Sequence, residues 1–185
     1  MKARSVDEAF RLFIQNKVNL DSEVVAHARE SRDNLLENIH GFHGDSDFFH
    51  LYSAVDIQFG SFARGTKIRP LDDIDLMIGL SAMGCTYNAS HGWSEVRINA
   101  STSDARLMDC AEDGLLNSTK ILNRFVAKLK GLPDYSRSEL HKNQQAVVLN
   151  LVTKEWSFDI VPCFSRSLKR MGDHIISFQT AMEGG

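Results

Sequence analysis

The sequence predicts one domain of the α/β (α+β) class, containing both helices and a β-sheet. The chain has 185 residues and 43% of them are hydrophobic, which is enough for one sizeable core. Segments with a 3.6-residue apolar period occur together with short apolar runs that are rich in β-branched residues. We therefore expect a single domain over residues 1–185, with residues 81–114 as a candidate loop-rich insertion.

Three segments carry the apolar spacing of amphipathic helices. The first covers residues 5–16, with Ser5 as a candidate N-cap. The second covers residues 21–40, and its apolar face is available to a core. The third covers residues 115–132 and stops before Pro133. We expect the lysine and arginine side chains of this third helix to be solvated.

Four segments have the composition of β-strands, at residues 52–59, 73–80, 146–152 and 156–161. The first leads into a Gly-Ser turn, and the second is its expected neighbour in the sheet. The last two are separated by a short polar break and therefore form a predicted β-hairpin. Residues 81–114 contain many Gly, Asn, Ser and Thr residues, with one short candidate strand at 95–98.

Two carboxylates stand at the head of the second strand. Asp73 and Asp75 are two residues apart, so in a strand they share one face while Ile74 and Leu76 turn to the core. Like charges this close raise each other's pKa unless a cation lies between them. Carboxylate oxygens favour a hard ion such as Mg²⁺, which also binds substrate phosphates. An isolated pair of this kind usually just faces water, so the neighbouring sequence decides its use.

The residues before this pair favour phosphate binding. Gly60 and Ser61 form a small turn that leaves backbone N–H groups and a hydroxyl free to meet a phosphate. The step from Gly65 to Thr66 gives a second place where the backbone can approach closely. An anion-binding turn and a pair of metal-binding carboxylates therefore lie close together in the sequence. Candidate auxiliary contacts to phosphate are Arg64, Lys67 and Arg69.

The string GSFARGT…DIDL resembles the signature of the DNA polymerase β-type nucleotidyltransferase superfamily. It is similar to the template-independent branch, which includes the bacterial cGAS/DncV-like nucleotidyltransferases (CD-NTases), the 2′-5′-oligoadenylate synthases and the archaeal CCA-adding enzymes. Members share a third carboxylate on a later strand, and Asp159 in the string FDIVPCF matches it. Asp159 also points away from the face of Phe158 and Ile160, and an acid inside such a strand needs a partner. The closest resemblance is to the CD-NTases.

The resemblance implies a polymerase β-like nucleotidyltransferase core, a mixed β-sheet backed by helices with the two acid-bearing strands adjacent. It implies a nucleotidyltransferase that uses NTPs and two Mg²⁺ (or Mn²⁺) ions. Asp73 and Asp75 would bridge both ions, and Asp159 would complete the site. Gly60 and Ser61 would hold the triphosphate. The implied products are cyclic or linear oligonucleotide second messengers of bacterial antiphage defence. From its composition, separately, we expect the candidate insertion at residues 81–114 to lie over the active site.

Charge and composition narrow the partners. The formal net charge of −3 does not favour capture of a long nucleic acid, which agrees with small NTP substrates. No run approaches the roughly 18 apolar residues of a membrane span, so no membrane contact and a cytoplasmic location are expected. The three cysteines lack any Cys-x-x-Cys pairing, which gives no signal for a disulfide framework or a zinc site.

The end of the chain leaves alternatives open. Enzymes of this branch usually continue past the third acid into a helical C-terminal lobe, and we expect that lobe to be absent here. The chain is then a short form, a piece of a longer protein, or a fragment completed by a protein partner. A minimal nucleotidyltransferase that modifies protein or an RNA 3′ end is one alternative function. A non-catalytic nucleotide-binding or interaction module is another, although the intact acids favour catalysis.

Overall fold

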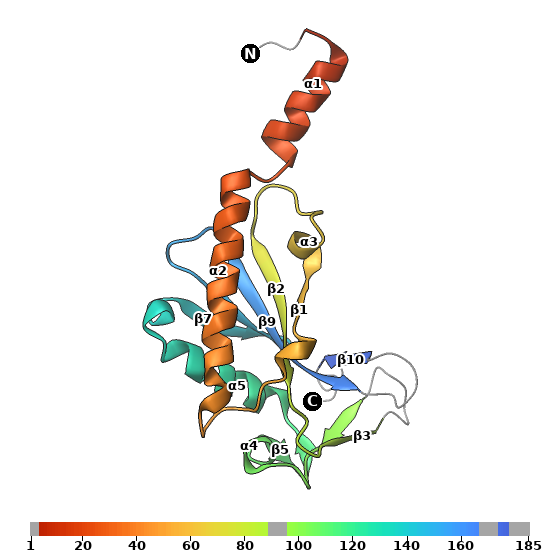
Figure 1. Cartoon of the computed structure of the whole chain (residues 1–185), viewed down its shortest axis with the longest axis vertical. Helices are drawn as coiled ribbons and strands as arrows, with labels where there is room; N and C mark the ends of the chain where they lie inside the picture. The colour runs from red at the N-terminus through yellow and green to blue at the C-terminus, as the bar shows by residue number, and fades with distance from the viewer. Residues whose placement is uncertain (1–3, 89–95, 167–173, 178–185) are drawn as a thin grey trace.

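The computed structural model describes residues 4–88, 96–166 and 174–177 (Figure 1). The α-helices of these ranges are α1 (Val6–Phe13), α2 (Ser22–Gly41), α3 (Gly60–Ala63), α4 (Ala105–Met108) and α5 (Ser118–Lys130). The strands of the main sheet are β1 (Ile57–Phe59), β2 (Asp73–Leu80), β7 (Glu139–Asn143), β8 (Ala146–Asn150), β9 (Ser157–Arg166) and β10 (His174–Ser177). The strands of a second sheet are β3 (Thr86–Asn88), β4 (Arg97–Asn99), β5 (Ala111–Glu112) and β6 (Leu115–Leu116).

The main sheet is mixed, as expected. Its strands follow the order β1-β2-β9-β8-β7, and β10 pairs with β9. Strands β2 and β9 run parallel, whereas the other pairs in this sheet are antiparallel. The predicted hairpin is present as β8 and β9, and the two acid-bearing strands are direct neighbours. The expected fold class is therefore confirmed.

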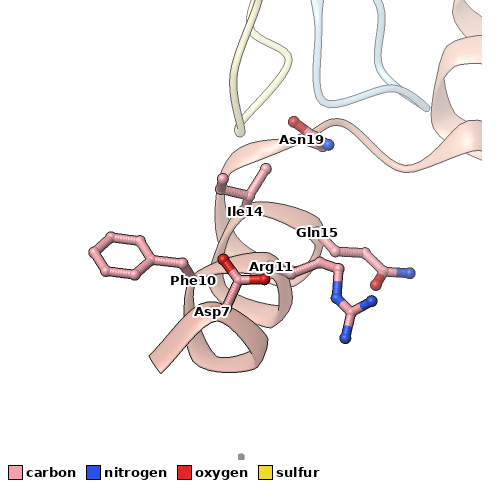
Figure 2. Close-up of a pocket in the computed structure, with 6 residues that line it drawn as sticks. All are labelled: Asp7, Phe10, Arg11, Ile14, Gln15 and Asn19. Carbon is pink, nitrogen blue, oxygen red and sulfur yellow. The ribbon is translucent and has the colours of Figure 1, made fainter. Parts of the chain in front are cut away.

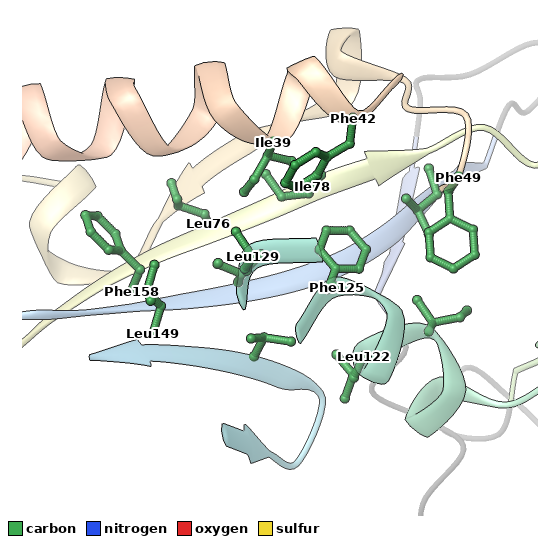
Figure 3. Packing of buried hydrophobic residues seen from close by; sticks show 14 of the residues in the cluster. Ile39, Phe42, Phe49, Leu76, Ile78, Leu122, Phe125, Leu129, Leu149 and Phe158 are labelled. Atoms are coloured by element: carbon green, nitrogen blue, oxygen red, sulfur yellow. The ribbon is translucent and has the colours of Figure 1, made fainter. Parts of the chain in front are cut away.

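One face of the main sheet carries the core. Figure 3 shows side chains of α2 and α5 meeting those of β2, β8 and β9. Because side chains alternate along a strand, the residues of β2 between these core positions point to the opposite face. The buried core positions on these elements include Leu35, Ile39, Ile74, Leu76, Ile78, Phe125, Leu129, Leu149, Phe158 and Ile160.

The N-terminal helices begin where the sequence predicts. Ser5 caps α1 by accepting a hydrogen bond from the N–H of Glu8, and Asp21 caps α2 by accepting one from the N–H of Glu23. Helix α1 nevertheless buries none of its residues, and Phe10 remains 64% exposed. Figure 1 shows α1 extending away from the sheet. Its apolar stripe therefore has no covering element among the described residues.

Two predicted elements begin three or more residues later in the structure. The strand expected at 52–59 begins only at Ile57, because Ser53–Val55 forms a 3-10 turn. This turn passes close to β2, where a Cβ on Gly79 would lie 2.4 Å from the backbone oxygen of Tyr52. The helix expected at 115–132 begins at Ser118, because Leu115–Leu116 pairs as β6 and Asn117 then caps α5 through the N–H of Lys120.

The segment after β2 forms the second sheet, in the order β3-β4-β6-β5. It follows Leu80, the residue at the end of β2 opposite Asp73, and at about 3.3 Å per residue these ends are roughly 23 Å apart. In Figure 1, β3, β5 and α4 gather at the end of the molecule farthest from α1. The expectation that this segment lies over the active site is therefore wrong for its described residues.

The cations of α5 bind other elements, so the expectation that they are only solvated is wrong for three of them. Lys128 contacts Asp45 at 2.8 Å and Asp47 at 2.6 Å. The remaining contacts are those of Arg124 with the backbone oxygen of Arg106 at 2.7 Å and of Lys120 with Glu112 at 3.2 Å. These contacts attach α5 to the loop after α2, to α4 and to the second sheet.

Of the helices in the described ranges, none has the length and apolar character needed to cross a membrane.

Candidate active site

The register of β2 and β9 brings the three sequence-predicted aspartates onto one face of the main sheet. Asp75 stands opposite Asp159, and Asp73 stands opposite Ser157. Neighbouring strands are about 4.8 Å apart, so this parallel register places the side chains of Asp75 and Asp159 next to each other. The face they occupy is opposite the core face of Leu76 and Ile160.

Burial and mutual repulsion act on these carboxyl groups. Burial raises the pKa of Asp75, and the charges of Asp73 and Asp159 raise it further. Burial also raises the pKa of Asp159, again with a contribution from Asp73. Both shifts mean that the charged forms are unfavourable in the metal-free protein. A cation between the acids would relieve that cost.

The predicted phosphate-binding turn lies directly against this cluster. Gly60 directly follows β1 and begins α3 with a φ of 74°, a conformation that favours glycine. A Cβ atom built on Gly60 would lie 1.7 Å from Oδ2 of Asp75. The absence of a side chain at position 60 is therefore what allows the turn to approach the acid.

The loop that follows the turn is closed by hydrogen bonds to its own backbone. The N–H groups of Thr66 and Lys67 both donate to the oxygen of Ser61, at 2.9 and 3.1 Å. The N–H of Gly65 donates to the oxygen of Phe62 at 3.1 Å. Gly65 and Thr66 thus use their N–H groups to shape the loop, and the backbone approach to phosphate at Gly60 and Ser61 stays a prediction.

Lys67 connects this loop to the acids. Its Nζ lies 2.5 Å from Oδ1 of Asp73 and also contacts Oδ1 of Asp72. Hydrogen bonds to Asp72 and Asp73 raise the pKa of Lys67. Interactions with the side chains of Asp73 and Lys67 lower the pKa of Asp72 to about 2. The sequence indicates Lys67 only as a candidate phosphate contact, and Asp72 carries no predicted role.

The two candidate arginines are placed differently. Arg64 is exposed at the end of α3, and its charge lowers the pKa of Asp75, which sets it near the acids. Arg69 instead contacts the backbone oxygen of Asn19 and lies 3.9 Å from Asp21. Arg69 therefore attaches the loop to the segment between α1 and α2, and its predicted role as a phosphate contact is not supported.

One further residue reaches the acid-bearing face through strand pairing. Asp75, Asp159, Val148 and His141 form a row across β2, β9, β8 and β7. Directly opposed residues of neighbouring strands share a face, so His141 lies on the side of the acids. The charge of His141 opposes the rise in the pKa of Asp159. Sequence reasoning missed His141, because only the pairing of β7 with β8 brings it there.

The donor set suits a hard divalent cation, since it consists of carboxylate oxygens beside the predicted phosphate-binding turn. Among the described residues, however, no three Asp, Glu, His or Cys side chains are already grouped around one metal position. Asp73 is instead bonded to the ammonium group of Lys67. The three carboxylates are therefore of the right kind to bind a divalent metal ion. In the present arrangement one of them, Asp73, is paired with Lys67.

A separate hollow lies on α1 and the segment after it (Figure 2). Its volume is about 400 Å³, and none of its lining residues belongs to the acids or to the turn. The lining residues are Asp7, Phe10, Arg11, Ile14, Gln15 and Asn19. This hollow is distinct from the candidate active site.

Comparison with known proteins gives a sequence relative and many similar solved structures, two of which are described here. The chain is 39% identical over 171 residues to a probable cyclic nucleotide synthase of Bacillus cereus strain VD146, covering 91% of this chain and 51% of the relative. The fold is similar to that of Escherichia coli MS115-1 CdnC in its complex with HORMA-deltaN, with a TM-score of 0.56, 19% identity and coverage of 94% of this chain and 46% of CdnC. For CdnC with ATP, the TM-score is 0.57 at 22% identity, with coverage of 94% and 45%. No family model matches the chain.

These matches cover nearly all of this chain but only part of the other proteins. The chain spans about half the length of the curated relative and of the similar solved chains. At their levels of identity, the two solved structures show the fold alone. The sequence relative is described as a probable cyclic nucleotide synthase.

Proposed function

Because this chain belongs to the cGAS/DncV-like nucleotidyltransferases over the half of their length that it spans, we propose that it supplies the catalytic half of an enzyme that joins NTPs. The products we propose are cyclic or linear oligonucleotide second messengers. One observation carries the proposal. The β2–β9 register sets Asp75 beside Asp159, and the Gly60 turn lies in contact distance of the same carboxylate.

Each part of this arrangement has a task in nucleotidyl transfer. The backbone at Gly60 and Ser61 receives the triphosphate of the donor NTP, since no side chain at position 60 blocks its approach to Asp75. Arg64, exposed beside the acids, adds positive charge for the phosphates. The acids lie where the acceptor hydroxyl has to lose its proton, so their position orients that hydroxyl toward the α-phosphate.

Asp73, Asp75 and Asp159 are the residues that would hold metal. Mg²⁺ or Mn²⁺ bound by these carboxylates would stabilise the charge on the attacking and departing oxygens. The raised pKa values of Asp75 and Asp159 support this assignment. Burial and mutual repulsion destabilise their charged forms, and a bound cation would stabilise them.

The substrates and partners follow as parts of the same proposal. ATP is the first NTP to test, because the similar CdnC structure was obtained with ATP. A HORMA-type protein is the first partner to test, because CdnC forms a complex with HORMA-deltaN. A cytoplasmic location and a role in antiphage signalling complete the proposed function.

The proposal is tested by incubating the chain with radiolabelled ATP or GTP and Mg²⁺ or Mn²⁺, followed by separation of the products. The Asp73→Asn/Asp75→Asn double variant removes two of the acids. The control variant is Asp134→Asn, which changes an exposed carboxylate in a turn outside the site. We expect ATP binding with metal, and labelled oligonucleotide, for the wild type and the control only.

Two results would contradict the proposal. Equal product from the double variant would show that the acids have no catalytic part. Absence of any metal-dependent ATP binding would show that the site does not take an NTP. Label that appears on protein instead of in an oligonucleotide would favour the protein-modifying alternative.

A further inference from the structure

Lys67 is the least exposed charged residue of the loop between α3 and β2. Arg64 and Arg69 in the same loop are exposed, whereas the side chain of Lys67 is only 15% exposed. A lysine withdrawn from water in this way is uncommon unless an acid receives its charge. Here two neighbouring acids do so, Asp72 and Asp73.

The backbone fixes where Lys67 can reach. Its N–H donates to the oxygen of Ser61 at 3.1 Å, so the residue is bound at its main chain to the phosphate-binding turn. Its side chain then extends from that turn to Asp73 at the head of β2. One residue thus has its backbone at the proposed triphosphate position and its charge at the proposed metal position.

The two carboxylates that hold the ammonium differ in kind. Asp73 faces the same side of β2 as Asp75, while Asp72 precedes the strand and is 63% exposed. An ammonium group that gives up Asp73 therefore keeps Asp72 as a second partner. Displacement of the ammonium group from Asp73 therefore leaves it paired with Asp72, so the free-energy cost of this movement is small.

We propose that Lys67 is a positioning residue that occupies the place of a cation at Asp73 until a divalent metal and an NTP arrive together. The metal then takes Asp73, and the ammonium group, retained by Asp72, turns to the phosphates. This inference rests on the proposed function, because it assumes that Asp73 belongs to a metal site.

The consequence is a dependence of metal binding on nucleotide. A metal ion that binds alone must displace the ammonium group of Lys67 from Asp73. The metal ion and the ammonium group then repel each other, because both are cations. When the metal ion binds together with an NTP, the negatively charged triphosphate can pair with the ammonium group of Lys67. Lys67 therefore weakens binding of the metal alone and favours binding of the metal together with NTP, and linkage requires the reverse effect of metal on NTP to be equal.

The test measures binding of Mn²⁺ alone to the metal-free chain, from the electron paramagnetic resonance signal of free Mn²⁺. Lys67→Met keeps the aliphatic stem and removes the charge, and Lys67→Arg keeps the charge. Lys120→Met is the matched control, because Lys120 also pairs with an acid, Glu112, but on α5 and the second sheet. Thermal unfolding without metal and Mn²⁺ binding with a non-hydrolysable ATP analogue are measured on the same samples.

For Lys67→Met we expect Mn²⁺ alone to bind about tenfold tighter, as for loss of one competing charge-assisted hydrogen bond. We also expect the metal-free variant to unfold at a lower temperature, and the gain in Mn²⁺ affinity on adding the analogue to shrink by the same factor. Lys67→Arg and Lys120→Met should bind Mn²⁺ as the wild type does. A lysine that only orders the loop would lower stability without tightening the binding of Mn²⁺.

Two outcomes would overturn the inference while leaving the proposed function in place. These are unchanged or weaker binding of Mn²⁺ alone by Lys67→Met, and an undiminished effect of the analogue on that variant. A different outcome separates the two proposals. If neither the wild type nor Lys67→Met binds Mn²⁺ even with the analogue present, both this inference and the metal-dependent function are overturned.

Discussion

Gly60 and Asp75 are packed so closely that a Cβ atom on Gly60 would lie 1.7 Å from Oδ2 of the aspartate. Contact between the turn and the acid is therefore possible only while position 60 has no side chain. This separates Gly60 from Gly65, whose φ of 67° also favours glycine but which has nothing within 4 Å of a built Cβ.

The first prediction compares these two glycines. Gly60→Ala must move Asp75 or the turn, so we expect a strong loss of metal-dependent NTP binding, about tenfold or more. Gly65→Ala carries only the backbone strain of its positive φ, about 1 kcal/mol of unfolding free energy, with NTP affinity nearly retained. Calorimetric titration with an NTP and denaturant unfolding check both variants. Equal losses of affinity would contradict the proposed contact of the turn with the triphosphate.

The second prediction concerns metal and stability. Mg²⁺ or Mn²⁺ with NTP binds only the folded chain, so it should raise the melting temperature, by an amount that grows with ligand concentration. Asp73→Asn with Asp75→Asn should abolish that rise, because the carboxylate ligands are lost. Differential scanning calorimetry with and without the ligands is the measurement. An equal rise in the melting temperature of the double variant would contradict the assignment of these aspartates as metal ligands.

The third prediction is a pH dependence of the metal-free protein. The pKa of Asp75 is raised in the folded state, so the folded chain binds this proton more tightly than the unfolded chain does. The contribution of Asp75 to stability is therefore largest below its unfolded pKa of about 4, and it is lost as pH rises through the folded value. Asp159 acts in the same direction.

The matched measurement is denaturant unfolding of the wild type and of Asp75→Asn from about pH 4 to 7. The asparagine variant lacks this titration, so its stability relative to the wild type should increase with pH. A difference between the two proteins that is constant over this range would mean that Asp75 is not destabilised by its charge. Asp72, whose pKa is lowered to about 2 in the folded state, is present in both proteins, so its contribution cancels when their stabilities are subtracted.

The fourth prediction concerns base selectivity. The site residues described in this chain are acids, cations and a glycine turn, which contact phosphates and metal and are indifferent to the base. Binding of ATP and GTP to this chain should therefore differ by less than about tenfold, or roughly 1.4 kcal/mol. Equilibrium titration with all four NTPs checks this. A large preference for one base would show that this half already contains the base-recognition groups.

The fifth prediction tests the contacts of α5. Lys128→Met removes the ion pairs to Asp45 and Asp47 and should lower the melting temperature by about 2 °C. Lys130→Met, on an exposed position of the same helix, should leave it nearly unchanged. Thermal unfolding of the two variants and the wild type, measured in parallel, checks this difference in melting temperature. Equal shifts would indicate that the Lys128 pairs contribute nothing measurable.

Strong local patterns made parts of this molecule predictable. Strand β2 begins and ends at the predicted residues, because acids at alternate positions and core residues between them define a half-buried strand. Helix α2 has both a capping aspartate and a glycine at its end. The strings around Asp73, Asp75 and Asp159 predict the acid cluster, and the structure places these residues on one face, although their metal-binding role stays a prediction.

Other parts depend on contacts that no local pattern encodes. The strands of the second sheet are two or three residues long, too short for a periodic signal. The apolar stripe of α1 predicts a helix but not whether any element covers it. The attachment of Lys67 to Asp73 depends on how the loop folds back to Ser61, which the sequence does not show.

The parallel pairing of β2 with β9 also sets when during folding the site can exist. Parallel neighbours need a long crossover, so Asp159 reaches Asp75 only after the second sheet, α5 and β7 have been synthesised and the β8–β9 hairpin has docked. A nascent chain that ends before β9 carries two of the acids and no complete set of ligands. Acquisition of metal affinity by the growing chain would therefore mark the docking of that hairpin, one of the last long-range contacts to form.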